Sequence, residues 1–411
     1  MAGPLDGIRV IDFTQMIAGP LATMTLADQG ADVIKVEPPA YGDHSRLVAT
    51  QRNGFSASFV NNNRNKRSVV LDLKDPDGLA AAHRLIAGAD VVVQNFRAGV
   101  AERIGIGEAK ARELNGRIIY TSMTGFGFSG PYVNKPVFDP LIQAASGLTT
   151  VQAGSDEQRP RLVRTILPDK LTGVQAAQAI SAALFARERT GKGQHIQLSM
   201  LDTVVAFLWS SDMGGHTFIG DELEHERAQS FIDLIYETAD GHVSVAVMQN
   251  KEWLRFTEAL DKPELRDDPR FVTAALREEN KDARLEAMQD AIKGYTSAEI
   301  IERLEAADVP CAPVLTRREM IRHPQIEANG LIVENSHPIA GPLRQTRPPA
   351  RFSETSPEYR FGAPLLGQDT SDVLAEAGYS AAEIDALIEK GTARQANLGE
   401  AQGAMKKGMK A

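Results

Sequence analysis

Short β-branched runs alternate with helical patterns over the first 200 residues. Runs such as DVIKVE at 32–37 and DVVV at 90–93 are apolar on both faces, and the helical pattern at 76–87 between them is amphipathic. Strands that are apolar on both faces and separated by amphipathic helices are typical of a parallel sheet covered on both sides. The pattern therefore predicts a doubly wound α/β domain. We expect its strands at 8–13, 32–37, 68–73, 90–93, 117–121 and 194–198, and its helices at 21–29, 76–87, 108–114, 169–189 and 201–210.

The pattern changes after residue 210. A strand at 243–247, followed by helices at 251–260, 283–294 and 297–306, predicts a smaller α/β domain over residues 225–325. We expect the segments at 310–314 and 331–334, and a helical stretch at 370–390, to return to the first domain. The domains are thus predicted at 1–210, 225–325 and 326–395. Residues 396–411, rich in Gly, Ala and Lys, are expected to form a flexible tail.

Composition narrows the class of protein. Hydrophobic residues make up 43% of the chain, which is enough to build a large core and argues against global disorder. The net charge of −9 disfavours a general nucleic-acid binder, which needs a basic surface. We find no signal peptide and no stretch of about 18 apolar residues, so we expect a cytoplasmic protein without a membrane span.

Three features that could suggest chemistry are interpreted as structural. Residues 125–130 (GFGFSG) fit G-x-G-x-x-G, but the dinucleotide fingerprint must open a helix, and Pro131 and Pro136 prevent one here. We interpret this segment as a loop over a cleft. The eight histidines form no H-x-x-x-H pair, so no metal site is predicted. The single cysteine, Cys311, rules out a disulfide within the chain and is interpreted as a packing residue.

A series of ordered blocks resembles one family, the class III CoA-transferases. This family includes formyl-CoA and carnitine CoA-transferases and, as relatives, the α-methylacyl-CoA racemases. The resemblance covers nearly the whole chain at consistent spacing. Its blocks are PLDGIRVIDFT at 4–14, AGP at 18–20, GADVIKVE at 30–37, GD at 42–43, NKRS at 65–68, LDLK at 71–74, DVVVQNFR at 90–97, RIG at 103–105, TGKGQ at 190–194 and PLLGQDT at 364–370.

The resemblance implies a fold and an activity. The family has a Rossmann-like large domain built from both chain ends and a smaller inserted α/β domain, and two chains interlock as a homodimer. Its members move CoA from an acyl-CoA thioester to a free carboxylic acid. The reaction passes through an aspartyl mixed anhydride and an aspartyl-CoA thioester. CoA would be a substrate here, with no permanently bound cofactor.

Asp169 is the candidate nucleophile. Its position at the start of the helix predicted at 169–189 is that of an ordinary helix N-cap. The two roles are compatible, because a helix N-terminus favours the ionised carboxylate that nucleophilic attack needs. The resemblance places the family's catalytic aspartate at this position.

The resemblance also implies the residues that line CoA. They are Ile17, Ala18, Leu71, Asp72, Leu73, Lys74, Asn95, Phe96, Arg97, Arg103, Phe138 and Asp139. Cations must meet the phosphates of CoA, and the cluster Arg64–Arg67, together with Lys74, Arg97 and Arg103, could supply them. Pro38 stands where the family has an arginine, so one contact on the adenine side is expected to be lost or supplied elsewhere.

Two other functions stay open. Racemases of this superfamily carry a histidine immediately before the aspartate at position 139 and use it as a base. Here Phe138 has no ionisable group and cannot abstract the proton, which favours a transferase. A non-catalytic acyl-CoA-binding protein is the other alternative, because the long glycine run of formyl-CoA transferases is missing. The candidate lids are Gly125–Gly130 and Gly214-Gly215.

Overall fold

The computed structural model describes residues 3–223 and 232–397, which form two compact units. The larger unit comprises the described parts of 1–149, 162–214 and 330–411, and the smaller one those of 150–161 and 215–329. The predicted domain boundary at residue 225 and the predicted tail beyond residue 397 lie outside the described residues. Helices α7 (Leu148–Ala153) and η2 (Gly214–His216) span the points at which the chain passes from one unit to the other.

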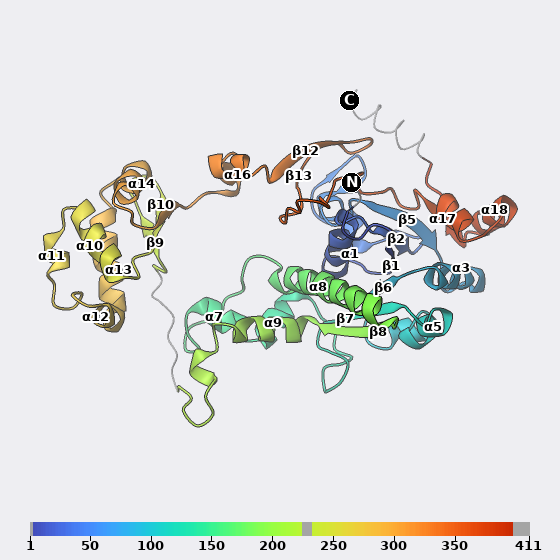
Figure 1. Cartoon of the computed structure of the whole chain (residues 1–411), viewed down its shortest axis with the longest axis horizontal. Helices are drawn as coiled ribbons and strands as arrows, with labels where there is room; N and C mark the ends of the chain where they lie inside the picture. The colour runs from blue at the N-terminus through green and yellow to red at the C-terminus, as the bar shows by residue number, and fades with distance from the viewer. Residues whose placement is uncertain (1–2, 224–231, 398–411) are drawn as a thin grey trace. The chain divides into compact units, whose positions relative to one another are not determined.

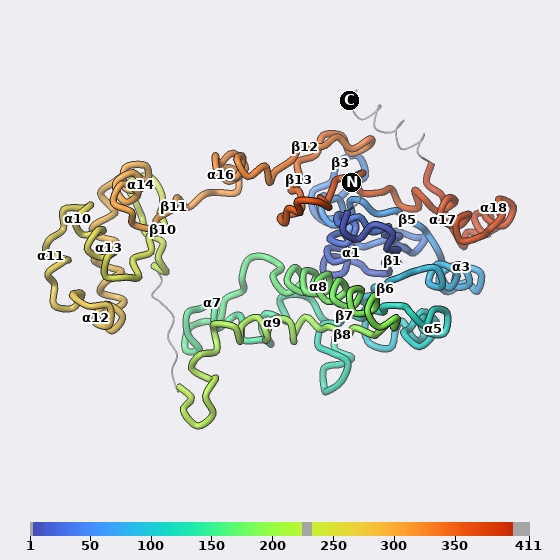
Figure 2. Tube along the Cα trace, viewed as in Figure 1, coloured from blue at the N-terminus to red at the C-terminus, as the bar shows by residue number. Residues whose placement is uncertain are grey.

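A seven-stranded sheet forms the centre of the larger unit. Its strand order is β14-β5-β2-β1-β6-β7-β8, and all neighbouring pairs are parallel except β14 with β5 (Figure 1). The C-terminal β14 thus joins a strand from the first part of the chain. Figure 2 likewise shows the C-terminal α17 (Thr370–Glu376), in red, beside β5, in blue. The predicted parallel α/β sheet is confirmed. Its strands are β1 (Arg9–Asp12), β2 (Asp32–Glu37), β5 (Lys66–Leu71), β6 (Val91–Gln94), β7 (Ile119–Thr124), β8 (Gln194–Ser199) and β14 (Ala393–Arg394).

Helices cover both faces of this sheet. Val10 and Ile11, successive residues of β1, are both fully buried, but in different apolar cores. The core around Val10 is closed by α1 (Ala18–Asp28) and α8 (Leu167–Thr190). The core around Ile11 is closed by α3 (Pro76–Ala87), α5 (Glu108–Leu114), α17 (Thr370–Glu376) and α18 (Ala381–Glu389). Because alternate strand residues point to opposite faces, this double cover explains why these strands are continuously apolar.

Shorter elements complete the larger unit. Most of them lie in loops that follow the strands or link the helices. They are η1 (His44–Leu47), β3 (Gln51–Arg52), β4 (Phe55–Ser56), α2 (Ala57–Val60), α4 (Val100–Arg103), α6 (Asp139–Ala145), α9 (Met200–Trp209), β12 (Ile332–His337) and β13 (Gly341–Thr346).

The smaller unit is a three-stranded antiparallel sheet with helices packed on it. Trp253, Phe256 and Phe271 lie at the centre of its core. Cys311 is partly buried against this core, in agreement with the interpretation as a packing residue. The elements are β9 (Ile235–Glu237), β10 (His242–Val245), α10 (Asn250–Ala259), α11 (Pro263–Arg266), α12 (Ala274–Glu279), α13 (Lys281–Ile292), α14 (Ser297–Ala306), β11 (Cys311–Pro313), α15 (Arg317–Met320) and α16 (Pro324–Ala328).

Two expectations for the C-terminal half need correction. The segment at 310–314 does not return to the first domain, because β11 pairs with β10 inside the smaller unit. The helical stretch at 370–390 is two helices, because Gly378 has a left-handed backbone (φ +86°) and ends the first one. A capping box between Ser380 and Glu383 then begins α18.

A fully buried charge network holds the loop that follows β1. The Asp12 carboxylate lies 3.0 Å from the Lys66 ammonium, and the Lys35 ammonium lies 2.9 Å from Asp43. Burial alone would raise the pKa of Asp12, but attraction to the two lysines outweighs it and holds that pKa well below its usual range. Lys35 also donates to the carbonyl of Thr14 (2.7 Å), so the network fixes the path of the chain as it leaves the sheet.

Helices α1 and α8 approach each other closely at a glycine. A Cβ atom on Gly173 would lie 2.7 Å from the backbone oxygen of Ala18 and 3.1 Å from the Cβ of Leu21. Only glycine avoids this overlap with the backbone of α1. The close approach brings the first turn of α8 beside the first turn of α1.

We predict that Gly173→Ala destabilises the protein. In an unobstructed helix the same change would stabilise it by about 1 kcal/mol. Here we expect the overlap with Ala18 to reverse the sign and lower the free energy of unfolding by about 1–3 kcal/mol. Urea unfolding measures the difference. Gly116→Ala is the matched control, because nothing lies within 4 Å of a Cβ at that position. A more stable Gly173→Ala protein would contradict the close approach.

Candidate active site

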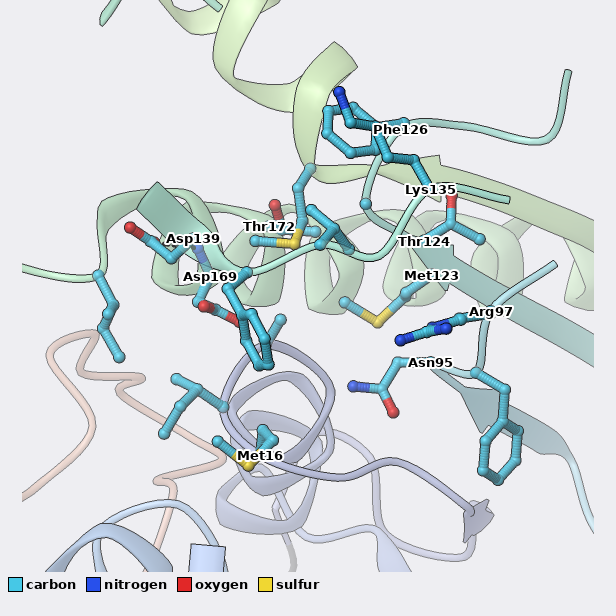
Figure 3. Close-up of a pocket in the computed structure, with 18 of the residues that line it drawn as sticks. Met16, Asn95, Arg97, Met123, Thr124, Phe126, Lys135, Asp139, Asp169 and Thr172 are labelled. Carbon is cyan, nitrogen blue, oxygen red and sulfur yellow. Dashed lines mark hydrogen bonds between the residues drawn. The ribbon is translucent and has the colours of Figure 1, made fainter. Parts of the chain in front are cut away.

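A pocket of about 360 Å³ opens at the carboxyl ends of β1 and β6 (Figure 3). The chain runs from β1 outward to β2 on one side, while β6 lies on the other side of β1. Such a switch point leaves a crevice between the loops of two neighbouring strands, and α/β proteins bind ligands there. The pocket is lined by the loops after β1, β6 and β7, by the first turns of α6 and α8, and by Met200.

The loops after β1 and β6 are tied to each other at the pocket. The Asn95 side chain accepts a hydrogen bond from the backbone N–H of Gln15 (2.9 Å) and donates to the carbonyl of the same residue (2.8 Å). Met16 adopts a left-handed backbone (φ 69°), which is strained for a residue other than glycine. Its N–H donates to the buried Asp43 (3.0 Å), so the charge network beneath the loop supports this conformation.

Asp169 lies in the first turn of α8, with its side chain toward α1. The helix begins at Leu167, and its N-cap is Ile166, so the predicted N-cap role for Asp169 is wrong. The carboxylate instead faces the backbone N–H of Ala18, the first residue of α1, which acts to lower its pKa. An N–H group in the first turn of a helix has no partner within that helix and carries positive partial charge. The amino end of α1 therefore supplies the polar contact that the Asp169 carboxylate makes.

Asp139 holds the first turn of α8 through a hydrogen bond to its backbone. It is buried, and its carboxylate accepts hydrogen bonds from the Gln143 side chain (2.7 Å) and from the backbone N–H of Asp169 (3.3 Å). It is the first residue of α6, whose N-cap is Phe138, so it does not cap its own helix. Gln143 also accepts from the N–H of Val163 (2.9 Å), in the segment that leads into α8. The pair thus fixes the start of the helix that carries Asp169.

Burial raises the pKa of Asp169 to about 6, and the nearby charge of Asp139 acts in the same direction. The backbone N–H of Ala18 opposes both effects but does not cancel them. At neutral pH the group is still mostly ionised. A carboxylate of raised pKa that is partly shielded from water is a better nucleophile and proton acceptor than an ordinary surface aspartate.

The structure brings eight of the predicted site residues to this pocket. These are Ile17, Ala18, Asn95, Phe96, Arg97, Phe138, Asp139 and Asp169. Leu71, Asp72, Leu73 and Lys74 do not line it, because they lie at the end of β5 or just after it, and β5 is separated from β1 by β2. Arg103, at the end of α4, does not line it either. For these five residues, a contact with CoA stays a prediction.

The predicted supply of cations for phosphate is wrong at the cluster Arg64–Arg67. Arg64 pairs with Asp28 (2.6 Å), Lys66 with Asp12 (3.0 Å), and Arg67 with Asp32 (2.6 Å), so these charges are neutralised within the fold. By contrast, no carboxylate in residues 3–223 and 232–397 lies within 4.0 Å of the cationic groups of Lys74, Arg97 or Arg103. These three cations remain available to a ligand.

Three residues of the site were not predicted from the sequence: Lys135 and Met200 line the pocket, and Gln143 does not line it but holds Asp139. Gln143 lies four residues after Asp139, a spacing that places both on one helix face and could have indicated it. Lys135 is the only lysine in the loop between β7 and α6, and its ammonium lies 4.0 Å from the ring centre of Tyr132. Met200 had no recognisable signal. The loop interpretation of residues 125–130 is confirmed, since the next helix begins only at Asp139.

Two further properties concern the described residues as a whole. Residues 3–223 and 232–397 contain no group of three or more His, Cys, Asp and Glu side chains that could hold a metal ion. Within the same ranges, none of the helices combines the length and the apolar character needed to cross a membrane.

We predict that Asp169→Asn stabilises the protein in a pH-dependent way. The folded protein binds this proton more tightly than the unfolded chain, so ionisation of Asp169 costs stability as pH rises from 3.8 through about 6. Asparagine removes that cost. We expect a gain of about 3 kcal/mol at most at pH 8, and of roughly half as much at pH 5. Urea unfolding of both proteins at the two pH values tests this, and an unchanged or lower stability at pH 8 would contradict it.

Comparisons with known proteins agree with this geometry. The family model described as CoA-transferase family III matches residues 5–370. The chain is 32% identical to the human succinyl-CoA:glutarate CoA-transferase, over 95% of this chain and 90% of that protein. It is 34% identical to an acetyl-CoA:oxalate CoA-transferase from Acetobacter aceti, over 89% of this chain and 94% of that one.

A solved structure shows the same fold. A CAIB/BAIF family protein from Brucella suis superimposes with a TM-score of 0.81 at 30% sequence identity, over 92% of this chain and all of that one. The family match spans most of the chain, and the relatives named for their activity are acyl-CoA:carboxylate CoA-transferases. The chain therefore belongs to CoA-transferase family III and is an enzyme of that class.

Proposed function

We propose that Asp169 is the nucleophile of a CoA transfer that passes through enzyme-bound intermediates. The observation that carries this proposal is the position of its carboxylate. It is partly shielded from water at the switch-point pocket, is held by the amino end of α1 and has a raised pKa. A carboxylate in such surroundings can attack a thioester and hold the acyl group away from water.

The proposed chemistry has two symmetrical halves. Asp169 attacks the carbonyl carbon of the donor acyl-CoA, and CoA thiolate leaves, which gives a mixed anhydride. The thiolate then attacks the aspartyl carbonyl, which releases the donor acid and forms an aspartyl-CoA thioester. The acceptor carboxylate attacks this thioester, giving a second anhydride and free thiolate. The thiolate finally attacks the acceptor's carbonyl, which forms the new acyl-CoA and restores Asp169.

Each of these steps passes through a negatively charged oxygen that needs donors. The N–H groups of Ala18 and Gly19 belong to the first turn of α1, where the helix itself provides no acceptors. Ala18 already contacts the Asp169 carboxylate, so its N–H lies at the place where charge develops. Donors fixed in this way stabilise an oxyanion without rearrangement, and we assign this role to the amino end of α1.

We propose that CoA enters between the loops after β1 and β6. Ile17, Asn95 and Phe96 then contact its pantetheine arm, and Arg97 lies on the side of its phosphates. Lys74 and Arg103 follow β5 and β6 at the same edge of the sheet, and both are free of carboxylate partners in the described chain. They are the cations we expect to meet the nucleotide end of CoA.

The pocket favours transfer over racemisation. A racemase needs a base that takes the α-proton, and Phe138, which is 72% exposed beside Asp139, cannot do so. Of the histidines in the described part of the chain, none lines the pocket. The relatives act on short acids, as their names state, so acetyl-CoA and succinyl-CoA are the first donors to try, with oxalate and glutarate as the first acceptors.

We predict that Asp169 becomes covalently modified during turnover. Incubation with acyl-CoA, followed by intact-mass and peptide mass spectrometry, should show CoA or an acyl group on Asp169. Asp169→Asn should lower kcat by at least about 10⁴-fold, because Asp139, the other carboxylate that lines the pocket in the described chain, is buried and already accepts hydrogen bonds from Gln143 and from the N–H of residue 169. Full turnover by this variant would contradict the proposal. Deuterium entering the α-carbon of product in heavy water, without exchange of CoA, would indicate a racemase instead.

We also propose that the protein is a homodimer. Large apolar side chains are exposed along α8 and α9, among them Val174, Phe185, Phe207 and Trp209. A soluble protein rarely leaves such a face uncovered. A second copy of the chain is the occupant we propose, because two interlocked chains are what the family resemblance implies.

Sedimentation equilibrium tests the dimer. We predict a mass of twice the 44.6 kDa chain at micromolar concentration, and dissociation when Phe185 and Phe207 are both changed to glutamate. Lys110→Glu, on the exposed surface of α5, is the control and should leave the dimer intact. A monomeric wild-type protein would contradict this proposal.

A further inference from the structure

Lys135 is a cation at the pocket that the proposed CoA contacts do not use. It lies in the loop between β7 and α6, and its ammonium is 4.0 Å from the ring centre of Tyr132 and 5.9 Å from that of Phe126. The two rings contact each other edge-to-face at 5.2 Å. Figure 3 shows Lys135 beside Phe126 and apart from Asp139 and Asp169.

The aromatic pair positions this ammonium without neutralising it. An aromatic face attracts a cation but removes none of its charge. No carboxylate in the described ranges 3–223 and 232–397 lies within 4.0 Å of the Lys135 ammonium, although Asp139 and Asp169 line the same pocket. Lys135 is therefore a cation without a carboxylate partner in the described chain, and Figure 3 shows it apart from Asp169.

The acids that enter this pocket need such a cation. The acceptor is an anion, and it must approach Asp169 while the buried Asp139 remains beside it. Attraction to a cation farther along the pocket would offset the repulsion from Asp139. The pocket is also lined by Met123, Val133 and Val137, whose apolar side chains suit a short apolar chain.

We propose that Lys135 binds the second carboxylate of a dicarboxylic acid whose first carboxylate reacts at Asp169. This inference rests on the proposed function and names its substrate class. A dicarboxylic acid joined to CoA through one end still has a free carboxylate at the other end. The same lysine can therefore hold the donor acyl-CoA in the first half of the reaction and the acceptor acid in the second half.

The experiment compares acids of equal length. Glutarate and valerate both have five carbons, but only glutarate carries a second charge, and acetyl-CoA serves as a donor without one. We expect the wild-type enzyme to prefer glutarate. Lys135→Met, which keeps an apolar stem, should lower kcat/KM for glutarate by about 10- to 100-fold, mainly through KM, and change that for valerate by less than about 2-fold.

Three further variants test whether the charge of Lys135 causes the preference for glutarate over valerate. Lys135→Arg should keep most of the preference for glutarate, because it keeps the charge. Tyr132→Leu removes one ring beneath the ammonium and should lower kcat/KM for glutarate by about 2- to 5-fold. Lys110→Met removes a lysine on α5 that pairs with Glu113 outside the pocket, and it should match the wild type. Lys135 is exposed, so we expect all variants to unfold at the wild-type temperature.

Several outcomes would overturn the role of Lys135 while the proposed function stands. One is an equal loss for glutarate and valerate in Lys135→Met, and another is no loss for either acid. A raised KM for acetyl-CoA with the preference between the acids unchanged would assign Lys135 to the phosphates of CoA. A wild-type enzyme that transfers CoA equally well to both acids would also overturn it. Failure of the proposed function looks different: no adduct forms on Asp169, and CoA reaches no acid.

Discussion

The approach of the amino end of α1 to the carboxylate of Asp169 is the interaction on which the site depends. It joins the first turns of two helices, because the backbone N–H of Ala18 reaches the side chain of a residue in the first turn of α8. The N–H of Asp169 in turn donates to Asp139 (3.3 Å). The amino ends of α1 and α8 both carry positive partial charge. The end of α1 lies next to the Asp169 carboxylate, and the end of α8 lies next to the Asp139 carboxylate.

This contact requires that the first turns of both helices be fixed in position by the residues packed against them. The loop into α1 is fixed by the buried network of Asp12, Lys35, Lys66 and Asp43, whose charges are matched within the fold. The approach of α8 is limited by Gly173, where any side chain would meet Ala18. Breaking a buried ion pair leaves an uncompensated charge and costs several kcal/mol, so the network is a rigid base for the loop. Rigidity at the base is what allows the strained backbone of Met16 above it.

The sequence predicted the scaffold better than the site. Strands such as β2 and helices such as α3 were predicted to the residue, because their patterns follow from burial on one or both faces. The segment at 310–314 was misassigned, since an apolar run of this length shows that it is buried but not against which partner. The role proposed for Asp169 came from the family resemblance, while the residues that shift its pKa, Ala18 and Asp139, lie far from it in the sequence.

The cations show why the charged residues were harder to interpret. In the sequence Arg64, Lys66 and Arg67 form a basic cluster that could supply cations to the phosphates of CoA, yet each is paired with an acid from another element. Such pairs become visible only once the strands are placed side by side. Proximity in sequence thus indicated a binding surface where the fold contains a set of ion pairs.

Burial acts on Asp12 and Asp169 in the same way, but the pKa values of the two carboxyl groups shift in opposite directions. Both are shielded from water, which by itself raises the pKa of a carboxyl group. At Asp12 two lysines reverse the effect, and the group becomes a permanent anion of the scaffold. At Asp169 the nearest charge is another carboxylate, so its pKa stays raised to about 6 and its ionised form remains reactive. The chain therefore neutralises its buried charges beneath the pocket and leaves charges unneutralised at the pocket itself, where a charged substrate could complete the pairing.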